Sequence, residues 1–159
     1  MKETELAEKV VDWLKSQHWE VYQEVQPHAF DRTADIVAVT GNLLWIIEVK
    51  KSLSLALLEQ ALRWRGYANY ISIATPNPKR HTKGEDAARL FLKHFGIGRL
   101  SIRRRSGDNV DQMIAPHLCR NRLGTLMDCL TEHHKTYAQA GNADGRRWTQ
   151  FRNTCMELQ

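Results

Sequence analysis

The sequence predicts an α/β protein, a three-layer sandwich with a central mixed β-sheet, followed by C-terminal helices. The chain has 159 residues, 42% of them hydrophobic and 26% charged, a composition typical of one globular domain with its own core. Two apolar segments, residues 34–39 and 43–49, are joined by Thr40-Gly41-Asn42 as a tight hairpin. Both are apolar on both faces, as strands are when helices cover both sides of their sheet. After this hairpin, helical and strand patterns alternate.

The predicted elements of the core follow the order αβββαβαβ. Residues 4–16 carry apolar side chains at helical spacing, and residues 19–25 alternate as a half-exposed strand does. The hairpin comes next. It is followed by a helix over 53–69, a strand over 70–74, a helix over 85–95 with Gly96 as its C-cap, and a strand over 99–103.

The pattern changes near residue 107, so we expect a core over residues 1–106 and a C-terminal helical extension over 107–159. In the extension we expect a helix over 110–134 with a break near Pro116, and a last helix over 148–158. We consider three alternative roles for the extension: packing on the core, formation of a dimer interface, or the start of a helix-turn-helix-like element around residues 145–159.

Cysteine content and hydropathy indicate a cytoplasmic protein. The three cysteines, at positions 119, 129 and 155, form neither a disulfide framework nor a zinc-ligand spacing. The longest uninterrupted apolar run is residues 43–47, far too short to cross a membrane. We therefore expect no membrane segment.

The hairpin predicts a pair of opposed carboxylates. If Gly41 and Asn42 are the loop residues, Asp35 faces Glu48, with Lys50 on the same face. Opposed Cβ atoms lie about 4.5–5.5 Å apart, and like charges at that distance destabilise a sheet, more so in an apolar environment. A divalent cation removes this cost, because Mg²⁺ prefers oxygen ligands and takes one or two carboxylates plus waters. The peptide carbonyl of Val49 offers a further oxygen.

This set of residues resembles the motif of the PD-(D/E)xK nuclease superfamily, which has the restriction-endonuclease-like fold. Asp35 matches the first acid, with Ala34 where the family often has Pro, and Glu48-Val49-Lys50 matches the ExK part. The order of elements is similar too, over roughly residues 4–104. In motif style the chain is similar to the Holliday-junction-resolvase-like and RecB/lambda-exonuclease-like branches.

Two further features of that family have counterparts here. A first helix often contributes a glutamate, which Glu5 or Glu8 provides, and we take Glu5 as the candidate, although acids in a first helical turn also suit the helix dipole. A later helix carries a Gln followed four residues on by an aromatic, matched by Gln60 and Trp64. Gln60 is equally well explained as a surface residue of its helix.

The resemblance implies a Mg²⁺-dependent DNA endonuclease, with Mn²⁺ as a substitute and no small-molecule cofactor. In this reading Asp35, Glu48 and the Val49 carbonyl hold the metal. Lys50 orients or helps to deprotonate a water molecule, and Gln60 positions the water, the lysine or the substrate backbone. Structure-specific cleavage of branched DNA by a homodimer, as in DNA repair and recombination, is one form that the resemblance allows, and sequence-specific or nonspecific cleavage stays open beside it. The alternative is a non-cleaving nucleic-acid-binding or assembly protein that keeps the fold, and RNA is an alternative substrate.

The distribution of charge favours a polyanionic partner. The net charge is +5, but residues 76–122 carry 11 basic and 4 acidic side chains, whereas residues 1–75 carry 8 and 10. The excess in the middle of the chain, which includes Arg99, suits a phosphate backbone. We expect the residues that bind DNA to be Lys51, Lys79, Arg80, Lys83, Arg103, Arg104 and Arg105.

Overall fold

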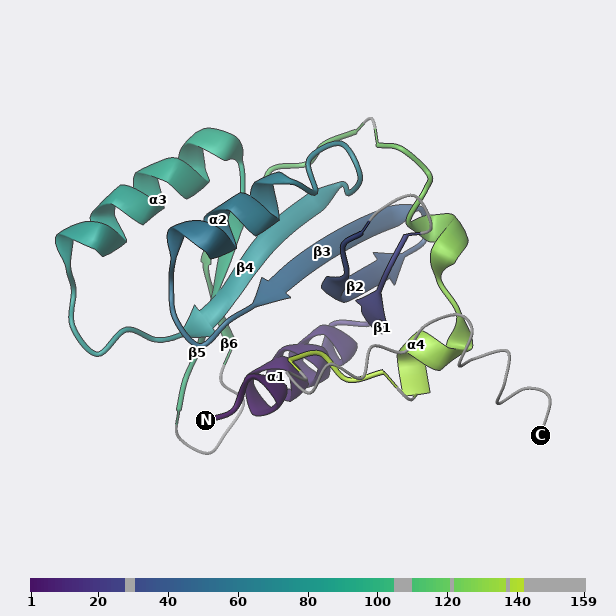
Figure 1. Cartoon of the computed structure of the whole chain (residues 1–159), viewed down its shortest axis with the longest axis horizontal. Coiled ribbons are helices and arrows are strands. Elements are labelled where there is room, and N and C mark those ends of the chain that lie inside the picture. The colour runs from purple at the N-terminus through teal and green to yellow at the C-terminus, as the bar shows by residue number, and fades with distance from the viewer. Residues whose placement is uncertain (28–30, 105–109, 121, 137, 142–159) are drawn as a thin grey trace.

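A six-stranded mixed sheet forms the centre of the protein in the computed structural model (Figure 1). The structure describes residues 1–27, 31–104, 110–120, 122–136 and 138–141. In the sheet, β1, β2 and β3 are consecutive antiparallel strands, β4 and β5 continue parallel to β3, and β6 closes the sheet antiparallel to β5. The strands are β1 (Glu20–Val25), β2 (Ala34–Thr40), β3 (Leu43–Val49), β4 (Tyr70–Pro76), β5 (Gly98–Ile102) and β6 (Val110–Ile114).

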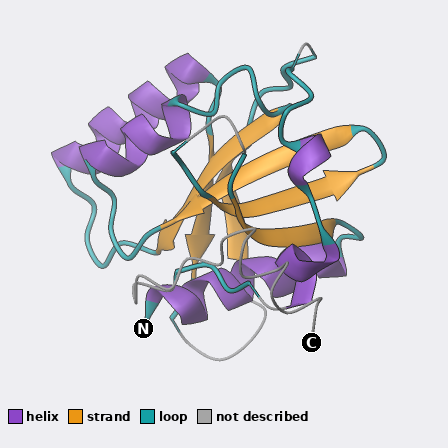
Figure 2. Cartoon of the chain, turned by 45° about the vertical axis from the view of Figure 1, so that its right-hand side comes forward, coloured by secondary structure: helices purple, strands orange, loops and turns teal. Residues whose placement is uncertain are grey.

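Helices cover both faces of this sheet, as Figures 1 and 2 show. On one face, α1 (Glu3–Ser16) buries Leu6, Val10 and Leu14 against strand residues such as Ile47. On the other face, α2 (Leu55–Leu62) and α3 (Lys83–Phe95) pack on a second apolar cluster. The predicted α/β sandwich is therefore confirmed, and the order αβββαβαβ holds through β5.

The caps of α2 and α3 follow from the local sequence. The Ser54 hydroxyl accepts a hydrogen bond from the Leu57 N–H, and the Thr82 hydroxyl accepts one from the Glu85 N–H. Gly96 ends α3 with φ +68°, as predicted. The helix predicted over 53–69 is shorter than expected, because α2 ends at Leu62 and Gly66 has φ +85°, which an α-helix does not allow.

The helix predicted over 110–134 is wrong. Residues 110–114 form β6, and the rest of the segment contains only a 3₁₀ turn (Met127–Cys129) and α4 (Glu132–Thr136). All five residues of β5 are buried, so its backbone groups need a partner on the outer side, and β6 supplies one. The helix predicted over 148–158 lies outside the described residues. None of the helices in the described ranges is both long and apolar enough to cross a membrane.

Candidate active site

The β2–β3 hairpin has the predicted register. Thr40 pairs with Leu43 and Ile36 pairs with Ile47, so one further step along the hairpin places Asp35 opposite Glu48. The two carboxyl groups are close enough for each to shift the pKa of the other. Oδ2 of Asp35 also accepts a hydrogen bond of 2.8 Å from the Val49 N–H. The turn thus brings two acids together at the C-terminal end of β3.

Glu48 is the more deeply buried of the two acids. It is only 4% exposed, and its Oε1 accepts a hydrogen bond of 2.6 Å from the indole N–H of Trp64, which is itself 3% exposed. Trp64 follows α2, so this bond ties the turn after the helix to the end of β3. Trp64 therefore holds one carboxylate oxygen of Glu48 in place from the face of the sheet that α2 covers.

Burial makes both carboxylates costly to ionise. For Asp35, burial raises the pKa, and the Val49 N–H and the charge of Lys50 oppose that rise only in part. For Glu48, burial and then the charge of Asp35 raise the pKa well above its ordinary value, against the opposing hydrogen bond from Trp64. Two acids that resist ionisation at one place are a site where a cation is strongly favoured.

Lys50 completes the site from the end of β3. Its Nζ lies 3.5 Å from Oε2 of Glu3, the first residue of α1. Burial alone lowers the pKa of Lys50, but the carboxylates of Asp35 and Glu3 outweigh it and leave that pKa above its ordinary value. Lys50 is thus an ammonium group at neutral pH.

The donor set fits a hard divalent cation. Within the described ranges, His, Cys, Asp and Glu form no group of three or more that holds a metal ion by itself. Mg²⁺ does not need such a group, because it commonly uses one or two carboxylates and keeps several waters. Asp35 and Glu48 would supply the carboxylates, because the hairpin register places them opposite each other.

The candidate site residues on α1 and α2 have different surroundings in the structure. Oε2 of Glu5 accepts a hydrogen bond of 3.0 Å from the Lys2 N–H and so caps α1, while Glu8 is exposed on the same helix. It is Glu3, which the sequence reasoning did not select, that reaches Lys50. Gln60 is exposed on α2, and its role in catalysis stays a prediction. Trp64, noted only as its companion, contacts the site directly.

Most of the predicted DNA-binding residues lie at one edge of the sheet. Strands β3, β4 and β5 are parallel, so their carboxyl ends meet at the edge where α1 begins (Figure 1). The edge cations, as we call them, are the exposed residues that follow these strands: Lys51, Lys79, Arg80, Lys83, Arg103 and Arg104. Arg103 also pairs with Asp111 at 2.7 Å. Arg105 lies outside the described residues.

Arg99 does not belong to this exposed set. It is 8% exposed, lies on β5 and forms an ion pair with Glu85 of α3. Its charge is therefore used inside the protein, where it joins α3 to the sheet, and is not available to a phosphate.

Comparison with known proteins yields one weak structural similarity. No family model matches the chain, and no curated protein matches it. Among solved structures, SfsA of Pyrococcus furiosus in complex with Ca²⁺ aligns with a TM-score of 0.38 and 11% identity, covering 70% of this chain and 61% of that one. The chain thus spans less than two thirds of SfsA. A similarity this low carries no information about function.

Proposed function

We propose that this protein is a metal-dependent nuclease that hydrolyses phosphodiester bonds in DNA. The observation that carries the proposal is the pair of carboxylates, Asp35 and Glu48, which the hairpin register places opposite each other at a strand end beside the Lys50 ammonium group. A buried pair of this kind is unfavourable in an apolar core. It is useful where a divalent cation and a phosphate group meet.

Each residue of the site has a distinct task. Asp35, Glu48 and the Val49 carbonyl would hold Mg²⁺, or Mn²⁺ in its place. The bound ion supplies a Lewis acid and an acidified water. Lys50 is held as a cation by the acids around it, so it donates hydrogen bonds to the attacking water and to the phosphoryl oxygens where negative charge develops. A raised pKa makes it a poor base, which favours orientation over deprotonation.

The edge cations support DNA as the substrate. They follow the ends of the parallel strands β3, β4 and β5, and Glu48 and Lys50 lie at the end of β3, so a phosphate backbone bound along this edge passes the carboxylates. Lys and Arg side chains on phosphates give affinity without sequence preference. Endonucleolytic cleavage of branched DNA by a homodimer is the specific form that we propose.

The test is a cleavage assay with metal and substrate varied. Purified protein is incubated with supercoiled, linear, single-stranded and four-way-junction DNA, and with RNA, in Mg²⁺, Mn²⁺ or EDTA. We expect cleavage of DNA in either metal and none in EDTA. Asp35→Ala and Lys50→Ala should abolish it, whereas Asp12→Ala, which removes an exposed acid from α1, should cut as the wild type does.

Two results overturn the proposal. The first is the absence of cleavage of every nucleic acid in both metals, and binding without cutting would then support the non-cleaving alternative. The second is undiminished cleavage by Asp35→Ala, which would trace the activity to a contaminant. Preferential cutting of RNA would keep the nuclease and replace the substrate.

A further inference from the structure

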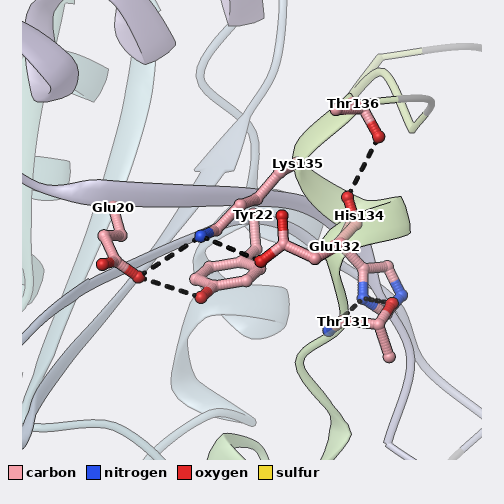
Figure 3. Close-up of polar contacts among 7 residues, drawn as sticks. All are labelled: Glu20, Tyr22, Thr131, Glu132, His134, Lys135 and Thr136. Carbon is pink, nitrogen blue, oxygen red and sulfur yellow. Dashed lines mark hydrogen bonds and ion pairs between the residues drawn. The ribbon is translucent and has the colours of Figure 1, made fainter.

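The C-terminal part of the described chain is fastened to the edge strand β1. Figure 3 shows Lys135 of α4 reaching across to β1, where its Nζ lies 3.5 Å from Oε2 of Glu20 and 5.0 Å from the ring centre of Tyr22. The Tyr22 hydroxyl donates to the same Glu20 oxygen at 3.0 Å. These contacts fix the point from which the chain continues toward α1.

Residues 138–141, which we call the strap, run from β1 to the first turn of α1. The N–H of Ala140 donates to Oε1 of Gln23 on β1 at 3.0 Å. Ala138 and Ala140 are buried, and Ala140 packs in the same apolar cluster as the buried face of α1. The strap is therefore part of the packed structure on the α1 side of the sheet.

At Gly141 the strap meets the backbone of α1 directly. Gly141 has φ +80°, and a Cβ atom built on it would lie 2.6 Å from the carbonyl carbon of Glu3 and 2.7 Å from the nitrogen of Thr4. These neighbours are main-chain atoms, which cannot move aside as the end of a flexible side chain can. Only glycine allows both this backbone conformation and this approach.

The residue that the strap touches is the one that holds the site lysine. Glu3 begins α1, and its Oε2 lies 3.5 Å from Nζ of Lys50. A continuous path of contacts therefore leads from Gln23 and the strap to Glu3, and from Glu3 to Lys50. Gly141 and Lys50, which are far apart in the sequence, are thus linked through Glu3.

We propose that Glu3 is a positioning residue for Lys50 and that the strap, through Gly141, sets where Glu3 stands. This inference rests on the proposed nuclease function and adds to it a control of the site from the C-terminal part of the chain. The strap touches no reacting atom. It acts because the position of the Glu3 carboxylate follows the position of the α1 backbone.

The first test compares two glycine substitutions. Gly141→Ala forces the strap and Glu3 apart, and we expect kcat for DNA cleavage to fall by about tenfold or more, with KM for DNA unchanged. Gly66→Ala is the matched control, because Gly66 also has a positive φ, +85°, but a Cβ there meets nothing within 4 Å. It carries the same backbone strain and should leave kcat unchanged. Equal loss in both variants would overturn the proposal.

The second test asks whether the strap acts through Glu3. Glu3→Gln removes the charge that faces Lys50 and should itself lower kcat. If the strap works through this carboxylate, Gly141→Ala should add little further loss in the Glu3→Gln background, because the two changes break the same path. Full additivity of the two losses would overturn the proposal.

The third measurement does not depend on catalysis. The ¹³Cε signal of Lys50, assigned with Lys50→Ala, should shift in Gly141→Ala and not in Gly66→Ala. If Gly141→Ala fails to fold, Gln23→Ala, which removes the acceptor of the Ala140 N–H, should shift the same signal by a smaller amount. An unchanged Lys50 signal in a folded strap variant overturns the proposal. A wild-type protein that cuts no nucleic acid overturns the proposed function instead, and the Lys50 signal still reports on the strap.

Discussion

The indole N–H of Trp64 donates a hydrogen bond of 2.6 Å to Oε1 of Glu48, and both side chains are almost completely buried. The bond restricts the orientation of the Glu48 carboxylate, which lies opposite Asp35 in the hairpin. Removal of a group that hydrogen-bonds to a metal ligand typically lowers metal affinity about ten- to a hundredfold. In the proposed metal site, Trp64 would therefore hold a ligand in place without touching the metal.

Trp64→Phe should weaken Mg²⁺ binding by about ten- to a hundredfold, because phenylalanine fills most of the space and cannot donate the hydrogen bond. Isothermal titration with Mn²⁺ and the dependence of cleavage on Mg²⁺ concentration both measure this change. Trp13→Phe is the control, since Trp13 packs edge-on against Trp45 on the α1 side of the sheet. Wild-type metal affinity in Trp64→Phe would contradict the assignment.

In the absence of metal, stability should fall as the pH rises. The pKa values of Asp35 and Glu48 are raised in the folded protein, first by burial, so the folded state binds protons that the unfolded chain releases. Their contribution to stability is complete below the ordinary carboxyl pKa of about 4 and is lost as the pH rises through the folded-state values. Saturating Mg²⁺ should reduce the loss, because the cation takes the place of the proton.

Urea unfolding at pH 5 and pH 8, in EDTA or Mg²⁺, measures this dependence. Asp35→Asn should flatten it, since it removes one of the two titrating acids and also the charge that, after burial, raises the pKa of Glu48. Asp31→Asn, at an exposed acid just before β2, should keep the wild-type dependence. Identical pH profiles for the wild type and Asp35→Asn in EDTA would show that the pair does not titrate as described.

The sequence predicted the carboxylate pair because the information is local. A two-residue turn sets the register of a hairpin, and the register alone places Asp35 opposite Glu48. Glu3 was not found, because Glu3 and Glu5 are both acids of one helical turn, and only the packing of α1 on the sheet decides which one reaches Lys50. β6 was missed for a similar reason. Only Val110 of its five residues is buried, and the strand forms because β5 needs a partner.

Arg99 was expected to be part of a basic surface, but in the structure it forms an ion pair inside the protein. Its ion pair with Glu85 is largely buried, with side-chain exposures of 9% and 14%. Glu85→Ala should lower the free energy of unfolding by about 3–5 kcal/mol, because it leaves a buried cation uncompensated. Glu59→Ala removes the ion-pair partner of Arg63, an exposed residue at the C-terminal end of α2. This change should lower the free energy of unfolding by only about 0.3–0.5 kcal/mol. Urea denaturation of both variants measures the difference, and equal costs would contradict it.

The edge cations should account for the salt dependence of DNA binding. Each phosphate contact contributes about 0.9 to the slope of log affinity against log salt on duplex DNA. Replacing Lys79, Arg80 and Lys83 with Gln should therefore lower the slope by up to about 2.7 and weaken binding to all sequences alike. Fluorescence anisotropy with a labelled duplex in EDTA, where no cleavage occurs, measures both quantities. Lys93→Gln is the control, because Lys93 comes from the same basic stretch but lies in the last turn of α3, away from the edge. If Lys93→Gln lowered the slope as much per charge as the edge substitutions do, the DNA would not be bound along the ends of β3, β4 and β5.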